Sequence, residues 1–232
     1  MMQSDQQIVW YYSNVLVPYT EACRWQESTA GKIAKKEHAE CVWLLEHPPM
    51  YTRGSSSMDY EYLDENNGIP VYPSGRGGRY TYHGPGQRVI YVLLNLNNRT
   101  CDLHAFLYSL EEWIIRALQR YSLECYRQKG KTGVWACDHT NMCNSQGKIA
   151  AIGVRVRKWI TFHGIALNIS TNLDDFRGII PCGLIGEDVT SIARITGKDE
   201  LVGALDKDLM ITFEGIFGGG STLNIKPHPV FE

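Results

Sequence analysis

The chain has 232 residues, 44% of them apolar, which is enough for one sizeable hydrophobic core. A net charge of −2 at pH 7 leaves no strongly basic stripe and argues against a nucleic acid partner. The seven cysteines show no disulfide spacing, no signal peptide is visible, and no apolar run approaches the ~20 residues that span a bilayer. We therefore expect a cytoplasmic protein with free thiols and no membrane segment. We also expect it to be a monomer.

Apolar periodicity predicts an α+β fold, a mixed β-sheet packed with helices, in a single domain that spans residues 1–232. Helices are expected at residues 20–36, 102–121 and 198–217, with a short helical turn at 174–180. Strands are expected at residues 7–12, 40–46, 69–72, 80–83, 89–96, 132–136, 148–156 and 159–169. Asp102 precedes the longest apolar stripe and is expected to cap its helix. Residues 50–68 predict a mobile surface loop, and the tail after Gly220 is expected to be loosely held.

A glycine-rich stretch at residues 74–96 is the feature around which the chain is organised. It predicts a loop with Arg76 and Arg79, a strand, a tight reversal at residues 84–86, and a second strand. Glycine adopts positive φ and lets a ligand approach the backbone, so the loop's N–H groups and arginines could hold a carboxylate, phosphate or acyl oxygen. Taken alone, the stretch fits a plain hairpin preceded by a flexible segment about equally well.

Cys182 and Lys148 are the candidates for covalent chemistry. Pro181 and Gly183 flank the cysteine, a rigid and a permissive residue that suit a thiol held out on a turn. A thiol with a pKa of about 8.5 is mostly protonated at neutral pH and needs a nearby cation or base to become a nucleophile. Lys148 begins an otherwise apolar run, where a lysine is expected to be paired or functional because burial of its charge is costly. The alternatives are a structural buried cysteine and a lysine that reaches water from a strand edge.

Two histidines, His83 and His163, each precede a glycine. Each could act as a general base or a hydrogen-bond donor, although a satisfied structural histidine is the commoner case. Residues 137–143 offer two cysteines, an aspartate and a histidine as possible metal ligands. No second pair with zinc-site spacing follows, so we interpret this segment as a hairpin and expect no metal.

Five motifs occur together in a fixed order along the chain. They are RGGRYTYHGPGQ at 76–87, GVW at 133–135, GKIAAIGVR at 147–155, HGIALN at 163–168 and PCG at 181–183. With these motifs the chain resembles the lipoyl(octanoyl) transferase family over residues 43–195. The resemblance implies the fold that biotin and lipoate protein ligases share.

The resemblance also implies a reaction, the transfer of octanoyl from acyl carrier protein to a lysine of a lipoyl domain, without a bound cofactor. The acceptors it implies are lipoyl domains of 2-oxoacid dehydrogenases and the glycine cleavage H protein. One alternative is an ATP-dependent lipoate or biotin ligase of the same fold, which activates a free acid as an adenylate and needs no cysteine. Another is a non-catalytic acyl-binding module, in which Cys182 is no more reactive than the other cysteines.

The family's acyl-thioester cysteine falls on Cys182 and its cysteine-activating lysine on Lys148. Its acyl-pocket segments fall on Arg76, Gly77, Gly78, Arg79, Tyr80, Thr81, Tyr82, His83, Ala151, Ile152, Gly153, Gly164, Ile165 and Ala166. The small residues in these segments leave room for an aliphatic chain. Nearby basic residues are expected to line the rim and to meet acidic carrier and lipoyl domains, namely Arg88, Arg155, Arg157 and Lys158.

Overall fold

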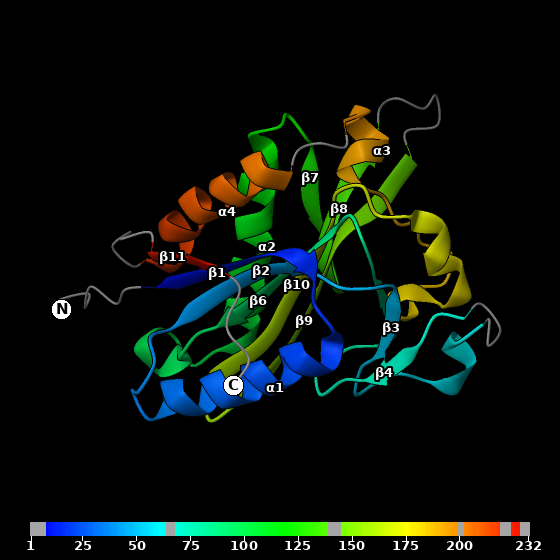
Figure 1. Ribbon diagram of the computed structural model, residues 1–232. Helices are drawn as coiled ribbons and strands as arrows, with labels where there is room; N and C mark the ends of the chain where they lie inside the picture. Colours follow the sequence, from blue (N-terminus) through cyan, green and yellow to red (C-terminus); the bar gives the residue numbers. More distant parts are fainter. Residues whose placement is uncertain (1–7, 64–67, 139–144, 199–201, 219–223, 228–232) are drawn as a thin grey trace.

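The computed structural model describes residues 8–63, 68–138, 145–198, 202–218 and 224–227 (Figure 1). Its main sheet consists of β1 (Val9–Leu16), β2 (Cys41–Glu46), β6 (Gln87–Leu93), β7 (Cys125–Gln128), β8 (Lys131–Asp138), β9 (Ser145–Arg157), β10 (Ile160–Asn168) and β11 (Asn224–Pro227). In space these strands follow the order β11-β1-β2-β6-β10-β9-β8-β7. Because β1 pairs with β2 in parallel and β6 pairs with β2 and β10 antiparallel, the predicted mixed sheet is confirmed.

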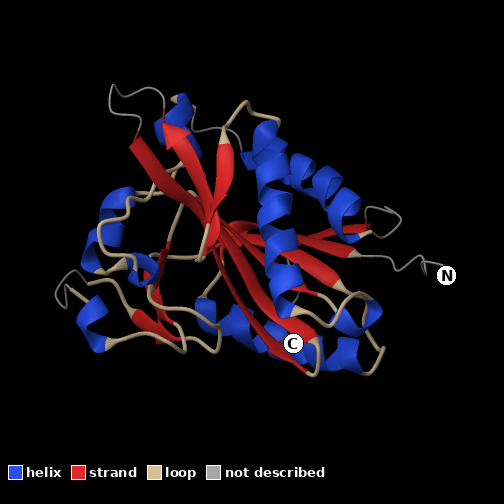
Figure 2. Ribbon diagram, turned by 180° about the vertical axis from the view of Figure 1, so that it is seen from behind, coloured by secondary structure: helices blue, strands red, loops and turns tan. Residues whose placement is uncertain are grey.

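A second, smaller sheet stands beside the main one (Figure 2). It contains β3 (Met50–Arg53), β4 (Val71–Pro73) and β5 (Thr81–His83), with β3 in the middle. Four short 3-10 helices lie in the connections, namely η1 (Asp59–Glu61), η2 (Leu96–Asn98), η3 (Leu173–Gly178) and η4 (Pro181–Gly183). Of these, η1, η3 and η4 lie near the small sheet and shape the site described below.

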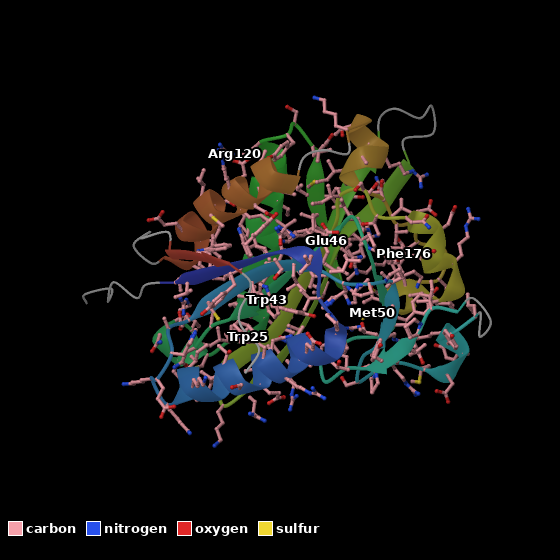
Figure 3. All side chains as sticks on the ribbon, viewed as in Figure 1. Trp25, Trp43, Glu46, Met50, Arg120 and Phe176 are labelled. Atoms are coloured by element: carbon pink, nitrogen blue, oxygen red, sulfur yellow. The ribbon has the colours of Figure 1, made fainter. Side chains whose placement is uncertain are left out.

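Helices cover both faces of the main sheet, as Figure 1 shows. The helices are α1 (Tyr19–Ala34), α2 (Leu103–Gln119), α3 (Ile192–Thr196) and α4 (Val202–Phe217). One core lies between the sheet and the pair α2 and α4, where Trp113 meets Phe213 at a centroid distance of 5.1 Å. The other core lies under α1, where Trp25 and Trp43 meet edge to face at 4.7 Å (Figure 3).

The sequence of α2 explains both its start and its position. As predicted, Asp102 caps the helix, because its Oδ1 accepts from the N–H groups of His104 and Ala105 at 2.8 and 3.1 Å. The buried stripe of the helix faces the sheet, and the Trp113 indole N–H donates to the Leu209 carbonyl of α4 at 2.8 Å. This bond ties the two helices together over one face of the sheet.

Among the segments that differ from the sequence-based expectation, three concern strands of the two sheets. The predicted loop at residues 50–68 contains β3, and Met50, Tyr51 and Thr52 are buried because β3 is the central strand of the small sheet. Within the tail, β11 is not loosely held, since it pairs in parallel with β1. Strand β7 was not predicted, because its four residues are all half-buried and show no alternation between an apolar and a polar face.

The glycine-rich stretch has the predicted order of loop, strand, turn and strand, but its two strands belong to different sheets. Strand β5 pairs with β3, whereas β6 lies between β2 and β10 in the main sheet. The reversal between them is fixed at Gly86, where φ is +77° and the N–H donates to the Glu46 carboxylate at 2.9 Å. The stretch therefore joins the two sheets instead of forming a hairpin.

The expectation that Arg88 lies on a rim is wrong. Its side chain is buried in β6 and forms a bidentate ion pair with Asp206 of α4, with Nε 2.9 Å from Oδ1. The guanidinium also lies 4.8 Å from the centroid of the Tyr12 ring. Arg88 is thus an anchor between the main sheet and α4. At the surface, Arg155 and Arg157 share Glu27 at 2.9 and 3.2 Å.

We expect Asp206→Asn to lower the free energy of unfolding by about 3–5 kcal/mol, because it leaves the buried Arg88 cation without its counter-charge. Asp59→Asn is the matched control. This change removes an ion pair between Arg53 and the Asp59 carboxylate. Because the Asp59 side chain is 89% exposed, the loss should cost less than about 1 kcal/mol. Urea unfolding measures both, and equal losses would contradict the role of the buried pair.

Candidate active site

A cavity of about 270 Å³ lies between the glycine-rich loop, the small sheet and the adjoining face of β9 and β10. Most of the predicted site residues border it. They are Arg76, Gly78, Arg79, Thr81, His83, Lys148, Ala151, Ile152, Gly153, Gly164, Ile165, Ala166 and Cys182. The fold therefore brings together residues from motifs that lie far apart in the sequence.

Gly77, Tyr80 and Tyr82 are the predicted site residues that do not border the cavity. Neighbouring side chains of a strand point to opposite faces, so residues 81 and 83 of β5 face the cavity while residues 80 and 82 face away. The two tyrosines pack in an aromatic cluster whose other buried members are Tyr51, Phe176 and Ile179. Gly77 supports the loop from behind, since its N–H donates to the Val154 carbonyl of β9 at 3.0 Å.

Small residues on two neighbouring strands form the floor of the cavity. Ala151 pairs with Ala166 and Gly153 pairs with Gly164 across β9 and β10, so no large side chain stands on this part of the sheet. A Cβ at Gly164 would overlap the Ile90 carbonyl oxygen, so only glycine allows β6 and β10 to approach this closely here. The floor therefore lets a ligand approach the backbone of the two strands closely.

Cys182 stands on η4 and faces the cavity from a strained turn. Its φ of 55° lies in the left-handed region, which a non-glycine residue keeps only when its surroundings hold it there. The Cys182 N–H donates to the Tyr80 carbonyl at 2.8 Å. The next residue, Gly183, also has positive φ, and a Cβ there would overlap Cδ of Arg79. Arg79 is itself held by an ion pair with the buried carboxylate of Glu61, so the turn is clamped from one side.

Lys148 borders the same cavity as Cys182 and, together with it, a smaller adjoining cavity. The residue is only 6% exposed, which excludes a lysine that reaches water from a strand edge. Its N–H donates to the Asp188 carbonyl at 2.8 Å and its carbonyl accepts from the Thr190 N–H at 3.1 Å. These bonds attach the segment after Cys182 to β9. Gly133 leaves the space that the lysine occupies, because a Cβ there would overlap Lys148 Cε.

Arg76 is a second buried cation at the cavity. Its guanidinium donates to the carbonyls of Thr52, Gly77 and Arg79 at 3.0, 3.0 and 2.8 Å, and to the Thr52 hydroxyl at 2.8 Å. Burial lowers the pKa of Arg76, and the charge that Cys182 can carry opposes this shift. Among the described residues the guanidinium has no carboxylate partner. The loop thus holds one positive charge beside the thiol.

Hydrogen bonds fix the protonation of His83. The Gln87 amide nitrogen donates to the carbonyl of Tyr82 and to Asn168 Oδ1, so its Oε1 accepts from His83 Nδ1 at 2.7 Å. Burial lowers the pKa of His83 well below its usual value and lowers the pKa of His163 to about 4. Both imidazoles are therefore neutral at physiological pH. For His83, whose two ring nitrogens both have partners, the structural interpretation is favoured over that of a general base.

Sequence reasoning did not single out several other residues that border the cavity. They include Tyr19, Thr52, Val89, Tyr91, Lys131 and Leu184. Residues 89 and 91 alternate on a predicted strand, and this period of two could have assigned them to one face. Thr52 was hidden in a segment interpreted as a loop, and its contact with Arg76 depends on the pairing of β3 with β5.

The possible metal ligands at residues 137–143 cannot be placed, because His139 and Cys143 lie outside the described residues. Elsewhere in the described ranges no three histidine, cysteine or acidic side chains gather as a metal site. In the same ranges, no helix has the length and apolar content that crossing a membrane requires.

We expect Gly183→Ala to slow the labelling of Cys182 by iodoacetamide at pH 7 several-fold, because the new Cβ overlaps Arg79 and moves the thiol away from the cations of the cavity. Gly186→Ala is the control. Gly186 has a similar φ of +77° but has nothing within 4 Å of a Cβ. Both variants should lose about 1–2 kcal/mol of stability from left-handed strain. Equal labelling rates, measured by peptide mapping, would show that the clamp does not position the thiol.

Comparison with known proteins identifies the family. Residues 18–214 match the model described as the lipoyl protein ligase A/B catalytic domain. The octanoyltransferase of Parvibaculum lavamentivorans is 44% identical over 211 residues, which cover 91% of this chain and 93% of that relative. The octanoyltransferase of Rhodospirillum rubrum is 44% identical over 209 residues, which cover 90% of this chain and 94% of that relative.

Solved structures confirm the predicted ligase-like fold. Lipoate-protein ligase A bound with ATP superposes with a TM-score of 0.70 at 14% identity, covering 95% of this chain and 88% of that one. The bipartite lipoate protein ligase from Thermoplasma acidophilum gives a TM-score of 0.68 at 14% identity, with coverages of 96% and 87%. At this identity the two structures share the fold alone, whereas the sequence relatives define the family. The chain belongs to the lipoyl protein ligase A/B family and, within it, to the octanoyltransferases.

Proposed function

We propose that this acyltransferase moves an octanoyl group from acyl carrier protein to a lysine of a lipoyl domain through a thioester on Cys182. The observation that carries the proposal is the position of Cys182 and Lys148 on one cavity whose floor consists of small residues. The thiol and the amine supply the reactive groups, and the floor beyond Lys148 supplies room for the acyl chain. Each chain methylene that leaves water contributes about 0.8 kcal/mol to binding.

In the first half-reaction, Lys148 takes the proton of Cys182 and the thiolate attacks the carbonyl carbon of the carrier's thioester. The carbonyl oxygen becomes an oxyanion. The N–H groups of Gly77, Cys182 and Gly183 already donate to backbone carbonyls, so they are not free to bind it. Arg76 borders the cavity, and we assign the electrostatic stabilisation of the oxyanion to its buried positive charge. The carrier's sulfur then leaves with the proton from Lys148, and Cys182 holds the acyl group.

The second half-reaction forms an amide. The amine of the acceptor lysine attacks the thioester on Cys182, and neutral Lys148 accepts the proton that the amine releases. Collapse of the tetrahedral intermediate breaks the carbon–sulfur bond, and the departing thiolate takes a proton from Lys148. The enzyme returns to its starting state with no co-reactant consumed. His83 and His163 lie beside this chemistry as neutral groups.

The partners in this proposal are octanoyl-acyl carrier protein as the donor, with lipoyl domains of 2-oxoacid dehydrogenases and the glycine cleavage H protein as acceptors. Arg155 packs against Gly75 at the start of the glycine-rich loop, and Arg157 follows it along β9. The two arginines share one glutamate, so this edge of the site keeps an excess of positive charge. That charge suits the acidic surfaces expected of both partners.

The ligases of the same fold provide the competing function. An ATP-dependent ligase would activate a free fatty acid as an adenylate, and the thiol of Cys182 would then have no chemical role. Because lipoate-protein ligase A binds ATP on this fold, the two functions must be separated by experiment. Transfer from octanoyl-carrier protein without ATP supports the acyltransferase, and strict dependence on ATP would contradict it.

We expect Lys148→Ala to slow transfer at pH 7 by about 10²–10⁴-fold, because both half-reactions lose their proton carrier. Its acyl-enzyme formation should recover at high pH, where the thiol ionises unaided. Lys148→Arg should keep part of the first half-reaction through its charge and lose the second, since arginine does not release a proton at these pH values. Quenched single-turnover assays with carrier and acceptor separate the two steps.

Cys182→Ser is the companion variant and should abolish turnover, because a serine is far harder to ionise than a thiol. Cys101→Ser, at an exposed cysteine remote from the cavity lining, is the matched control and should behave like the unmodified protein. If Lys148→Ala carries out both half-reactions at the wild-type rates at pH 7, Lys148 has only a structural role.

A further inference from the structure

Lys148 is buried, yet in the described part of the chain its side-chain nitrogen has neither a carboxylate nor a hydrogen-bond acceptor. The group that faces its charge is the indole ring of Trp135, whose centroid lies 4.9 Å from Nζ. The two residues pair directly across β8 and β9, and Trp135 is 1% exposed. An ammonium over an indole face is attracted by the negative face of the ring, and most strongly when water is absent.

The backbone of β8 makes this contact possible. A side chain at Gly133 would fill the path of the lysine, since a Cβ there overlaps Cε and lies 3.2 Å from Nζ. Gly133 has φ +131°, and its N–H donates to the Glu111 carboxylate of α2 at 2.9 Å. The register of β8 and β9 shifts between Val134 and Trp135, beside this glycine. This irregular stretch lets the Lys148 side chain pass over Gly133 and reach the Trp135 ring on the same strand.

Among the residues that the structure describes, no carboxylate competes with the ring for the Lys148 side-chain nitrogen. The titratable groups on the elements around Lys148 are Cys182, Glu187, Asp188, Lys131, Glu111, Arg76 and Arg79, together with His83, His163, Tyr19 and Tyr91, which border the same cavity. Glu187 forms an ion pair with Lys131, and Glu111 receives the Gly133 N–H and lies 3.2 Å from the Arg127 guanidinium. Asp188 is exposed and contributes its backbone carbonyl to the Lys148 N–H.

We propose that Trp135 is a positioning residue that holds Lys148 as a cation beside Cys182, so that formation of the acyl-enzyme depends on the face of the indole ring. This inference rests on the proposed function. A carboxylate in the same place would cancel the field of the ammonium at the thiol and would resist its deprotonation. A neutral ring stabilises the cation but accepts no proton, so Lys148 can still act as a base in the second half-reaction.

The two half-reactions therefore respond in opposite ways when the ring is weakened. Less stabilisation of the ammonium leaves less thiolate at neutral pH, so acyl-enzyme formation slows and its pH profile moves to higher pH. Aminolysis needs neutral Lys148, so its rate stays unchanged or rises. A simple packing defect at Trp135 would lower both rates and would not shift the pH profile.

The test uses tryptophans with one, two or three ring fluorines, which withdraw electron density from the ring face while nearly preserving its shape. The chain contains six tryptophans, so labelled wild-type protein is compared with labelled Trp135→Phe protein to isolate the contribution of position 135. We expect acyl-enzyme formation at pH 7 to fall about twofold per fluorine in the wild-type chain, as a cation–π contact implies. In Trp135→Phe and in Lys148→Met the fluorines should have no effect.

The outcomes separate this inference from the function on which it rests. If the unlabelled wild-type chain forms no acyl-enzyme on Cys182, the proposed function fails and the inference fails with it. If unlabelled Lys148→Met forms the acyl-enzyme at the wild-type rate, Lys148 does not activate the thiol and the inference alone is overturned. If Lys148→Met is slow but the fluorine series in the wild-type chain is flat, the function stands and the role of Trp135 is overturned. If the rates of both half-reactions fall together as fluorines are added, Trp135 acts only through packing and its positioning role is overturned.

Discussion

The burial of two basic side chains beside one cavity is the constraint on which the rest of this structure depends. Arg76 and Lys148 are 8% and 6% exposed, and neither meets a carboxylate within the described ranges. A buried charge is costly unless other groups compensate it. Backbone carbonyls and the Thr52 hydroxyl surround Arg76, and the Trp135 ring faces Lys148. The positive charge thus remains available to stabilise a thiolate and an oxyanion. A carboxylate in contact with either side chain would neutralise that charge.

The two sheets divide the work of building the site. The main sheet supplies a rigid floor, because small residues pair across β9 and β10 at its centre and both of its faces are covered by helices. The small sheet supplies the walls, because β5 presents residues 81 and 83 to the cavity and packs Tyr82 against Phe176 of η3. There Tyr82 donates to the Asp175 carboxylate at 2.7 Å, which fastens the segment that leads to Cys182. Cys182, the proposed nucleophile, is therefore held by the small sheet, and Lys148 by the main sheet.

Much of the fold could be predicted because its long elements have strong periodic patterns, as in α2 and in the strand that carries Lys148. The missed elements have physical explanations. Strand β3 is too short to show a pattern within a polar segment, and a strand–turn–strand signal cannot tell a hairpin from a crossing between sheets. Arg88 was misplaced because its partner, Asp206, lies on a distant helix. Motifs selected Cys182 and Lys148, but the Glu61–Arg79 clamp and the Trp135 contact depend on distances between segments, which no local pattern encodes.

The most direct test of the central claim is the location of the acyl group on the unmodified protein. The protein is mixed with octanoyl-acyl carrier protein in the absence of acceptor and ATP, and is then analysed by intact mass and peptide mapping. The account predicts one octanoyl group per chain, on the peptide that contains Cys182, and its loss when a lipoyl domain is added. Octanoyl on another cysteine, or transfer to the lipoyl domain with no acyl-enzyme detected at any time point, would contradict it.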